Sequence, residues 1–367
     1  MLQSLDVRSV KTGRAGRELK HIDILDGWRC LSITLVMVGH LVPLGPSRFR
    51  LNEIAATSGM VIFFTLSGFL ITRFLIADGD IRRFLIRRIF RILPLAWLGM
   101  SLAFILAGGT ANEYAGNLLF YANLPPYFLL PAGGHFWSLC LEVQFYLSVA
   151  LLVAFGGTRT LLLLPILALA VTGLRIDEGA HINIVTWYRI DEILAGATLA
   201  LIYEGRLGEV PQSWLTKCRF FYFLPLLVLS AAPWMGPLNY ARPYVAAALV
   251  GASIYNAPEW VRALSRQRVV KYVAQISYAL YVFHGIYSAS WLGSGEKLVK
   301  YAKRPLLLAV TFASSHLSTF YYERYWVGFA HRLNKKKADA RVVDEIDTTA
   351  EQLPQTVEAS RCNEGTE

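Results

Sequence analysis

Apolar stretches long enough to cross a bilayer recur along this chain of 367 residues, and they constrain its fold more than any other feature. A membrane-spanning helix needs about 20 predominantly apolar residues. Hydrophobic residues make up 54% of the chain and charged residues only 17%, whereas soluble domains average about 25% charged residues. The mean hydropathy is +0.41. These observations predict an all-α, polytopic integral membrane protein with about ten transmembrane helices.

Ten stretches qualify as candidate spans, although several carry polar residues or are close to the minimum length. Nine or eleven spans is the alternative interpretation. The apolar stretch 117–131 is broken by Pro125, Pro126 and Pro131, so we expect it at the membrane surface and not across the membrane. The expected spans are residues 24–44, 57–77, 89–107, 136–155, 160–174, 189–204, 219–235, 240–257, 272–292 and 305–327.

The distribution of Lys and Arg predicts the orientation of these spans. Basic residues are frequent in the N-terminal segment and in the linker after the second span, whereas the linker 108–135 has none. The positive-inside bias therefore places the N-terminus in the cytoplasm, and ten spans return the C-terminus there. One loop would then face outward against this bias, which either weakens the assignment of the last spans or marks a basic external surface; it carries Lys297, Lys300, Lys303 and Arg304.

The chain divides into a basic cytoplasmic N-terminal segment (1–23), a transmembrane domain (24–330) and a polar cytoplasmic tail (331–367) that we expect to be disordered. The first apolar run is too long for the core of a cleavable signal peptide, so we expect it to remain as a membrane anchor. The formal net charge of +10 does not indicate nucleic-acid binding, because the basic residues fall in short loops that suit topology setting and contact with the lipid bilayer. The four cysteines lack metal-ligand or disulfide spacing, and we expect no metal site.

The first span contains the strongest candidate site residues. Arg29 and His40 are eleven positions apart, about 1100° of helical rotation, so their side chains share one face roughly 16 Å apart along the axis. Asp26 falls near the same stripe. An ionisable residue at membrane depth costs about 2.5–3.5 kcal/mol on insertion scales, so the stripe indicates a lined pathway or a site. His40 can take a proton from a hydroxyl or carry an acyl group; a structural histidine at a span end is the alternative.

Two arginines near the start of the third span suggest a phosphate site. Arg88 and Arg91 lie at positions i and i+3 and therefore point the same way. Guanidinium groups favour bidentate phosphate binding, which would suit a phosphorylated cofactor such as coenzyme A. The alternative is a cytoplasmic loop that only sets topology.

The fourth span has a polar face formed by Ser138, Glu142 and Tyr146, which repeat at helical spacing. Glu142 has no basic residue nearby in its own span. Its partner should come from another helix, and Arg29 is the obvious choice. A purely structural buried ion pair is the alternative.

Later spans add weaker candidates, and two histidines, His135 and His316, are expected to be structural or interfacial. Metalloprotease, α/β-hydrolase, P-loop and paired-cysteine zinc motifs are absent from the sequence, so those functions have no support. The weaker candidates are Arg189, Asp191, Glu323 and His284, the last of which also fits a satisfied core histidine.

Five motifs, in order from about residue 20 to 330, resemble those of the membrane acyltransferase 3 family. Leu25-Asp26-Gly27-Trp28-Arg29 followed by His40 is similar to its opening Arg-x10-His motif. The remaining four are the second-span signature Phe63–Thr72, the Arg-x-x-Arg motif Arg88–Pro94, the Trp-Ser-Leu-x-x-Glu-x-Gln-Phe-Tyr motif Trp137–Tyr146, and the C-terminal signatures Ile276–His284 and Tyr322-Glu323. The chain departs from the pattern at Trp28, Cys30 and Tyr325, which affects the fit of the substrate more than the chemistry.

The resemblance implies O-acylation, mostly O-acetylation, of glycans at the bacterial cytoplasmic (inner) membrane, with acetyl-coenzyme A as the acyl donor and no permanently bound cofactor. It implies His40 as the base or transient acyl carrier, and Arg29 and Glu142 as its orienting or oxyanion-stabilising partners. Arg88 and Arg91 would hold the phosphates of coenzyme A.

The acceptor that the resemblance implies is a glycan or lipid-linked oligosaccharide: exopolysaccharide, O-antigen or a nodulation factor, with a slight preference for the last two. A proton-coupled transporter or flippase for glycans or lipids is the rival from another class. The lack of inverted-repeat symmetry and the unbroken charged spans argue against a transporter. A structural membrane scaffold is a third possibility, but it would not need an intramembrane set of Arg, His and Glu.

Overall fold

The computed structural model describes residues 20–334, and within this range all regular secondary structure is helical, without a strand. The predicted all-α fold is confirmed. The last helical stretch continues through the π-helical turn Ser318–Glu323 to residue 334. The α-helices are α1 Asp23–Leu41, α2 Leu51–Asp78, α3 Ile81–Ala107, α4 Ala111–Leu118, α5 Trp137–Gly156, α6 Leu164–Asp177, α7 Asp191–Tyr203, α8 Glu209–Lys217, α9 Phe223–Ala231, α10 Leu238–Asn256, α11 Glu259–Ser265, α12 Arg268–Ala289, α13 Lys297–Ala302 and α14 Arg304–Leu317.

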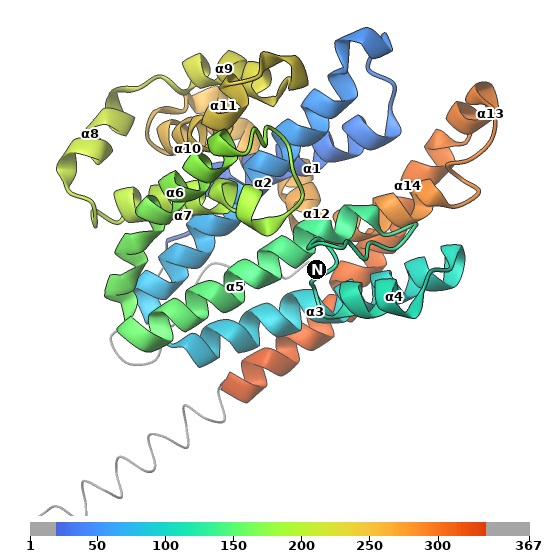
Figure 1. Ribbon diagram of the computed structural model, residues 1–367, viewed down its shortest axis with the longest axis horizontal. Helices are drawn as coiled ribbons and strands as arrows, with labels where there is room; N and C mark the ends of the chain where they lie inside the picture. The colour runs from blue at the N-terminus through green and yellow to red at the C-terminus, as the bar shows by residue number, and fades with distance from the viewer. Residues whose placement is uncertain (1–19, 335–367) are drawn as a thin grey trace, which may run out of the picture.

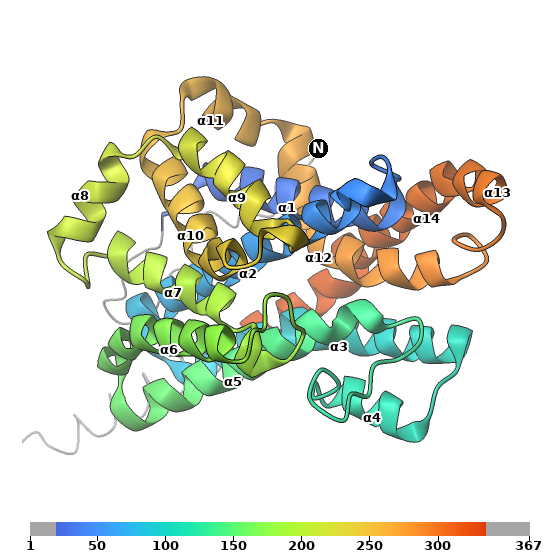
Figure 2. The same ribbon diagram turned by 45° about the horizontal axis from the view of Figure 1, so that its top comes forward.

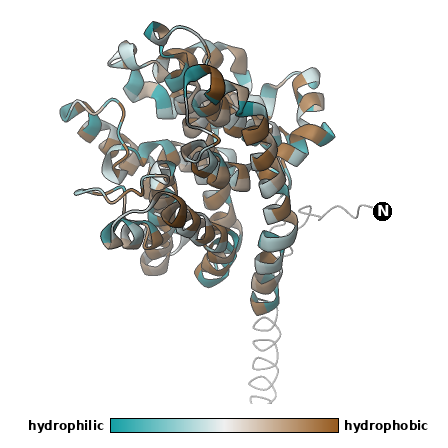
Figure 3. Ribbon diagram, turned by 90° about the vertical axis from the view of Figure 1, so that its right-hand side faces the viewer, coloured by the Kyte–Doolittle hydropathy of each residue, from teal (hydrophilic) through white to brown (hydrophobic). Residues whose placement is uncertain are grey.

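Five helical segments in the described part of the chain are long and apolar enough to cross a membrane. A sixth is possible if α8 and the segment Phe220–Ala231, which meet at a bend of 83°, count as one broken span. Figure 3 shows hydrophobic stretches along the helices, interrupted by hydrophilic residues. The expected number of about ten spans is not confirmed by helix length and hydropathy. The five segments are Asp23–Leu41, Ser47–Asp78, Ile81–Ala107, Gly134–Gly156 and Thr158–Asp177.

The two ends of α1 mark two ends of the helical domain, which we call the Asp23 end and the His40 end. Lys271, near the start of α12, donates to Asp23 (Nζ–Oδ1 3.0 Å), and His284, further along α12, contacts His40. Helices α1 and α12 are therefore parallel. Asn52, near the start of α2, donates to the carbonyl oxygen of Gly39 (2.8 Å), so α2 runs antiparallel to α1.

Contacts between connecting segments show that the long helices alternate in direction. Asn123, between α4 and α5, donates to Thr186 between α6 and α7 (Nδ2–Oγ1 2.9 Å), which brings these two segments together on the side of the His40 end. At the Asp23 end, Arg73 near the end of α2 donates to Glu204 after α7 (Nε–Oε1 2.7 Å). The apolar stretch 117–131 does not form a continuous helix, as expected.

Helix α2 lies at the centre of the domain, with α3 and α5 on one side of it and α9, α10 and α11 on the other (Figures 1 and 2). It packs closely against α1 and α7. Glycine makes the contact between α2 and α7 possible. A Cβ atom built on Gly68 would lie 1.9 Å from the carbonyl oxygen of Ile193, and one built on Gly196 would lie 2.0 Å from that of Thr65. Small residues at such positions let two helix backbones approach directly.

The expected N-terminal segment and tail lie mostly outside the described residues. Only residues 20–23 of the first and 331–334 of the second are described, and the latter continue the last helix.

Candidate active site

Three histidine rings from three separate segments meet at the His40 end. His40 is in the last turn of α1, His284 is in the second half of α12, and His135 lies just before α5. The centroid of the His284 ring is 5.4 Å from that of His40, in an edge-on contact, and 5.1 Å from that of His135. His284 is fully buried, whereas His40 is exposed. The cluster therefore has one accessible ring backed by two inner rings.

Hydrogen bonds to backbone carbonyls fix the protonation of the two inner rings. Nδ1 of His284 lies 2.7 Å from the carbonyl oxygen of Tyr281, and Nε2 of His135 lies 3.1 Å from that of Val282. A carbonyl oxygen only accepts, so these nitrogens carry the N–H groups. Nε2 of His284 is buried and has no hydrogen-bond partner in the described part of the protein.

The hydroxyl of Tyr281 connects this histidine cluster to α5. It donates to the carbonyl oxygen of His135, so the 2.5 Å contact between Ser138 Oγ and the Tyr281 oxygen is donated by the serine. The ring of Tyr281 stacks on Phe63 of α2, with centroids 6.3 Å apart. These contacts hold the start of α5 against α12 beside the cluster.

Glu142 lies one turn beyond Ser138 on α5, and the residue is 5% exposed. It accepts hydrogen bonds from Ser67 of α2 and from Tyr146 of its own helix. The expected ion pair with Arg29 is not present, because no nitrogen of Arg29 comes within 4.0 Å of the carboxylate. Two hydroxyl groups take the place of that partner.

Arg29, Arg88 and Arg91 form a second group of side chains, which we call the arginine group. Each of them is close enough to Glu142 or to one another to interact electrostatically. The guanidinium of Arg88 lies over the ring of Tyr146, 5.7 Å from its centroid. None of the three is fully buried, and Arg91 is exposed. The expectation that Arg88 and Arg91 point the same way fits this arrangement.

Glu323 adds a second carboxylate to this region. It is 8% exposed, ends the π-helical turn, and accepts a hydrogen bond from Thr319 (2.9 Å). It also interacts electrostatically with Arg91. A π-helical turn is rare and often occurs at functional sites. The motif residue Glu323, a weak candidate from sequence, thus lies beside the arginine group.

The structure therefore separates the expected site residues into two layers. His40 lies with the other histidines, while Arg29 and Glu142 lie deeper toward the Asp23 end and do not contact it. Sequence reasoning missed the place of His135 and the contribution of Ser67 and Tyr281. Their positions inside the recognised motifs, or two residues before one in the case of His135, were the available signal.

Arg189 and Asp191 belong to a separate buried ion-pair network, between the starts of α7 and α10 and the end of α6. Arg175 pairs with Asp191, and both are fully buried. Glu192 pairs with Arg189 (3.1 Å) and with Arg242 (2.9 Å). Each carboxylate has a guanidinium partner, and the network links α6, α7 and α10.

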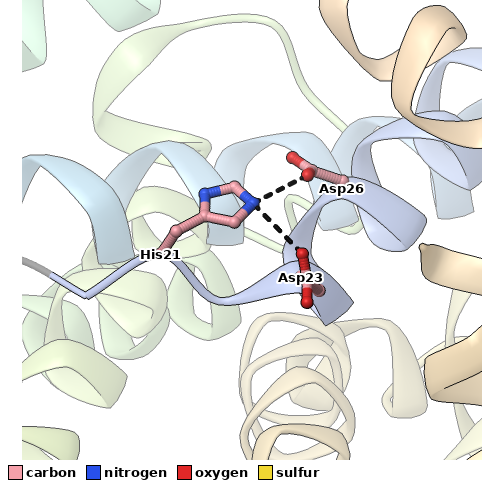
Figure 4. Close-up of side chains that lie close together, drawn as sticks. All are labelled: His21, Asp23 and Asp26. Carbon is pink, nitrogen blue, oxygen red and sulfur yellow. Dashed lines mark hydrogen bonds and ion pairs between the residues drawn. The ribbon is translucent and has the colours of Figure 1, made fainter. Parts of the chain in front are cut away.

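At the start of α1, His21, Asp23 and Asp26 place possible metal-ligand atoms within 4.8 Å of one another (Figure 4). His21 bonds to Asp26 (2.9 Å), and Asp23 is paired with Lys271 (3.0 Å). Arg266 also lies 3.9 Å from Asp23. These ion pairs account for the arrangement of the cluster, and we assign no ion to it.

The fold and these motif residues define a membrane acyltransferase of the acyltransferase 3 class. A model of that family, described as an acyltransferase domain, matches residues 22–324, and the chain belongs to this family. Two curated proteins of Staphylococcus aureus, from strains COL and MSSA476, are each 22% identical to it over 326 aligned positions. Both carry the name "Putative O-acetyltransferase". The alignments cover 73% of this chain and 51% of each relative, so the chain spans about half the length of the curated relatives it matches. No solved structure matches the chain.

Proposed function

We propose that the protein is a membrane O-acetyltransferase that moves an acetyl group from acetyl-coenzyme A to a hydroxyl of a surface or secreted glycan or lipo-oligosaccharide. The observation that carries this proposal is that a possible proton acceptor and a positively charged group lie on one face of α1. His40, an accessible proton acceptor, lies at one end, and Arg29, within the arginine group, lies deeper. Membership of an acyltransferase family and the names of the Staphylococcus aureus relatives support the reaction class.

We further propose ten spans in the bacterial cytoplasmic membrane, with both termini in the cytoplasm. The alternating direction of the long helices supports this number. The basic residues Arg82 and Arg83 follow α2 at the Asp23 end, which supports a cytoplasmic position for that end. The His40 end would then face outward, where the acceptor glycan is found.

In the proposed reaction, His40 takes the proton of the acceptor hydroxyl as the oxygen attacks the acetyl carbonyl carbon. The carbon–oxygen bond forms, the carbon–sulfur bond of the donor breaks, and the proton passes to the thiolate of coenzyme A. In a two-step version of this reaction, His40 first carries the acetyl group as a transient acyl-histidine and then passes it to the acceptor, with the same bonds and protons exchanged overall.

The arginine group is the proposed binding site for the donor phosphates. The three guanidinium groups face the carboxylates of Glu142 and Glu323, and Arg29 also interacts electrostatically with Asp26. Arg88 and Arg91 have no ion-pair partner within 4.0 Å among the described residues, so their N–H groups remain available to phosphate oxygens. Glu142 would hold this group in place, and Arg29 would polarise the thioester from the side opposite His40.

Membrane vesicles that contain the protein test the proposal when they receive acetyl-coenzyme A labelled in the acetyl group and a glycan extract from the same cells. The expected result is a labelled glycan ester that mild alkali removes, and mass spectrometry of surface glycans from cells with and without the gene should show the same ester. Flux of glycan or protons without the donor, and no ester when the donor is supplied, would instead establish the transporter or flippase.

A further inference from the structure

The lone pair on Nε2 of His284 has no donor in the structure. This ring is fully buried, and its other nitrogen already donates to the carbonyl oxygen of Tyr281. Nε2 can therefore only accept a hydrogen bond. A buried acceptor without a donor destabilises a folded protein. A donor from a neighbouring group would remove that penalty.

The neighbouring rings differ in what they can offer. The titratable groups that face His284 are His40 from α1, His135 from the segment before α5, and Tyr281 from its own helix. The single N–H of neutral His135 already donates to Val282, and the hydroxyl of Tyr281 already donates to the carbonyl oxygen of His135. The ring of His40, by contrast, makes no hydrogen bond to any residue in the range 20–334. Only His40 has an N–H free to donate to His284.

We infer that His284 is a positioning residue for His40, an inference that rests on the proposed acetyl transfer. Its lone pair accepts a hydrogen bond from one N–H of His40 and so selects the tautomer of that ring. The other nitrogen of His40 then carries the lone pair on the accessible side, where the acceptor hydroxyl binds. When an imidazole donates a hydrogen bond from one N–H, its other nitrogen becomes a better base and nucleophile.

The proton balance of the reaction is unchanged by this arrangement. The hydroxyl proton moves to the free nitrogen of His40, and the ring becomes an imidazolium. Its second N–H remains on His40, and its hydrogen bond to His284 strengthens as the positive charge develops. The proton on the first nitrogen then passes to the thiolate that leaves when the carbon–sulfur bond breaks.

Three substitutions of His284 separate positioning from packing. His284→Phe keeps a ring but removes the acceptor. In His284→Gln the amide oxygen can reach the place of Nε2, whereas the shorter side chain of His284→Asn ends near the place of Nδ1. We expect the Phe and Asn variants to lose about 100-fold or more in kcat with an unchanged KM for acetyl-coenzyme A, because tautomer control in a catalytic triad is worth up to about 10⁴-fold. The Gln variant should recover at least about 10-fold over Phe.

A second readout does not need acetyl transfer. Diethyl pyrocarbonate modifies the free imidazole nitrogen, and mass spectrometry of the full-length protein in detergent gives the rate at His40, with the exposed His21 as internal reference. We expect the His40 rate to fall about five-fold in His284→Phe and to recover in His284→Gln, since nucleophilicity follows the hydrogen bond. His316→Phe is the matched control, because His316 bonds to Tyr272 and lies outside the cluster.

The outcomes distinguish the two proposals. A wild-type protein that transfers no acetyl group, but whose His40 modification depends on residue 284, overturns the proposed function and leaves the contact between the histidines standing. Acetyl transfer and His40 modification that are both unchanged in His284→Phe overturn the positioning role. A parallel loss of melting temperature and activity in all three variants, without recovery in Gln, also overturns it and makes His284 a packing residue.

Discussion

Tyr146 donates a hydrogen bond to Glu142, one turn before it on α5, and Ser67 of α2 donates to the same carboxylate oxygen. The carboxylate is thus held by two hydroxyl groups and not by a guanidinium. An amide oxygen accepts the same two hydrogen bonds, so the charge of this side chain can be removed without removing its contacts.

We therefore expect Glu142→Gln and Glu142→Leu to differ. The Gln variant should keep its stability within about 1 kcal/mol, since both hydroxyls retain an acceptor, while acetyl transfer falls because the charge beside the arginine group is lost. The Leu variant should lose about 1–3 kcal/mol for each hydroxyl left without an acceptor. Thermal unfolding in detergent and the vesicle assay measure the two effects. Equal destabilisation by Gln and Leu would show that the charge itself stabilises the fold.

His40→Ala should leave the protein in the membrane at normal abundance and abolish acetyl transfer. His40 is exposed at the end of α1, so its removal leaves no buried cavity. His316→Ala is the control, because it removes a histidine that bonds to Tyr272 away from the cluster. Activity, abundance and melting temperature are measured for both. Wild-type acetylation by a folded His40→Ala protein would remove this residue from the reaction.

Replacement of Arg88 and Arg91 by Ala should weaken the binding of acetyl-coenzyme A, because each charged hydrogen bond is worth about 1.5–3 kcal/mol. Isothermal titration calorimetry on the purified protein measures the affinity. Arg82→Ala on the same helix is the control: its side chain is exposed, lies near the start of α3, and should leave the affinity unchanged. An equal loss in the control, or none in the double variant, would assign these arginines to membrane topology alone.

Gly68→Ala should destabilise the protein strongly, whereas Gly173→Ala should not. The new methyl group at 68 would overlap the carbonyl oxygen of Ile193, and this backbone contact can only be relieved by moving α7 away from α2. Overpacking of this kind costs about 1–3 kcal/mol or more. A Cβ on Gly173, in α6, meets no atom within 4 Å, and alanine favours the helix there. Melting temperatures of the two variants in detergent compare the effects.

Much of the fold was predictable because it depends on local hydropathy and on helical periodicity. The apolar runs predicted the all-α class, and the prolines in 117–131 predicted a break in that stretch. Helices such as α12 are harder to classify, because residues like Lys271 and His284 lower the hydropathy of a 22-residue helix whose second half is largely buried in the bundle. The number of spans therefore stays a prediction.

Within the site, only the relative positions of residues on the same helix were predictable. Spacing within α1 placed Arg29 and His40 on one face, and spacing within α5 placed Tyr146 beside Glu142. Partners from other helices depend on the order in which the helices pack, which no local pattern contains. This is why the sequence points to Arg29 as the partner of Glu142 when Ser67 takes that place, and why it predicts only a structural or interfacial role for His135.

The parallel pairing of α1 with α12 has a consequence for biosynthesis. His40 enters the membrane with α1, and His284 follows only after some 240 further residues, as counted along the sequence. The imidazole of His40 therefore lacks the other histidines of the cluster until nearly the whole domain has been inserted. A chain whose translation stops early carries every residue of the opening motif and still lacks the histidine cluster, so premature termination is expected to yield inert fragments and no partly active enzyme.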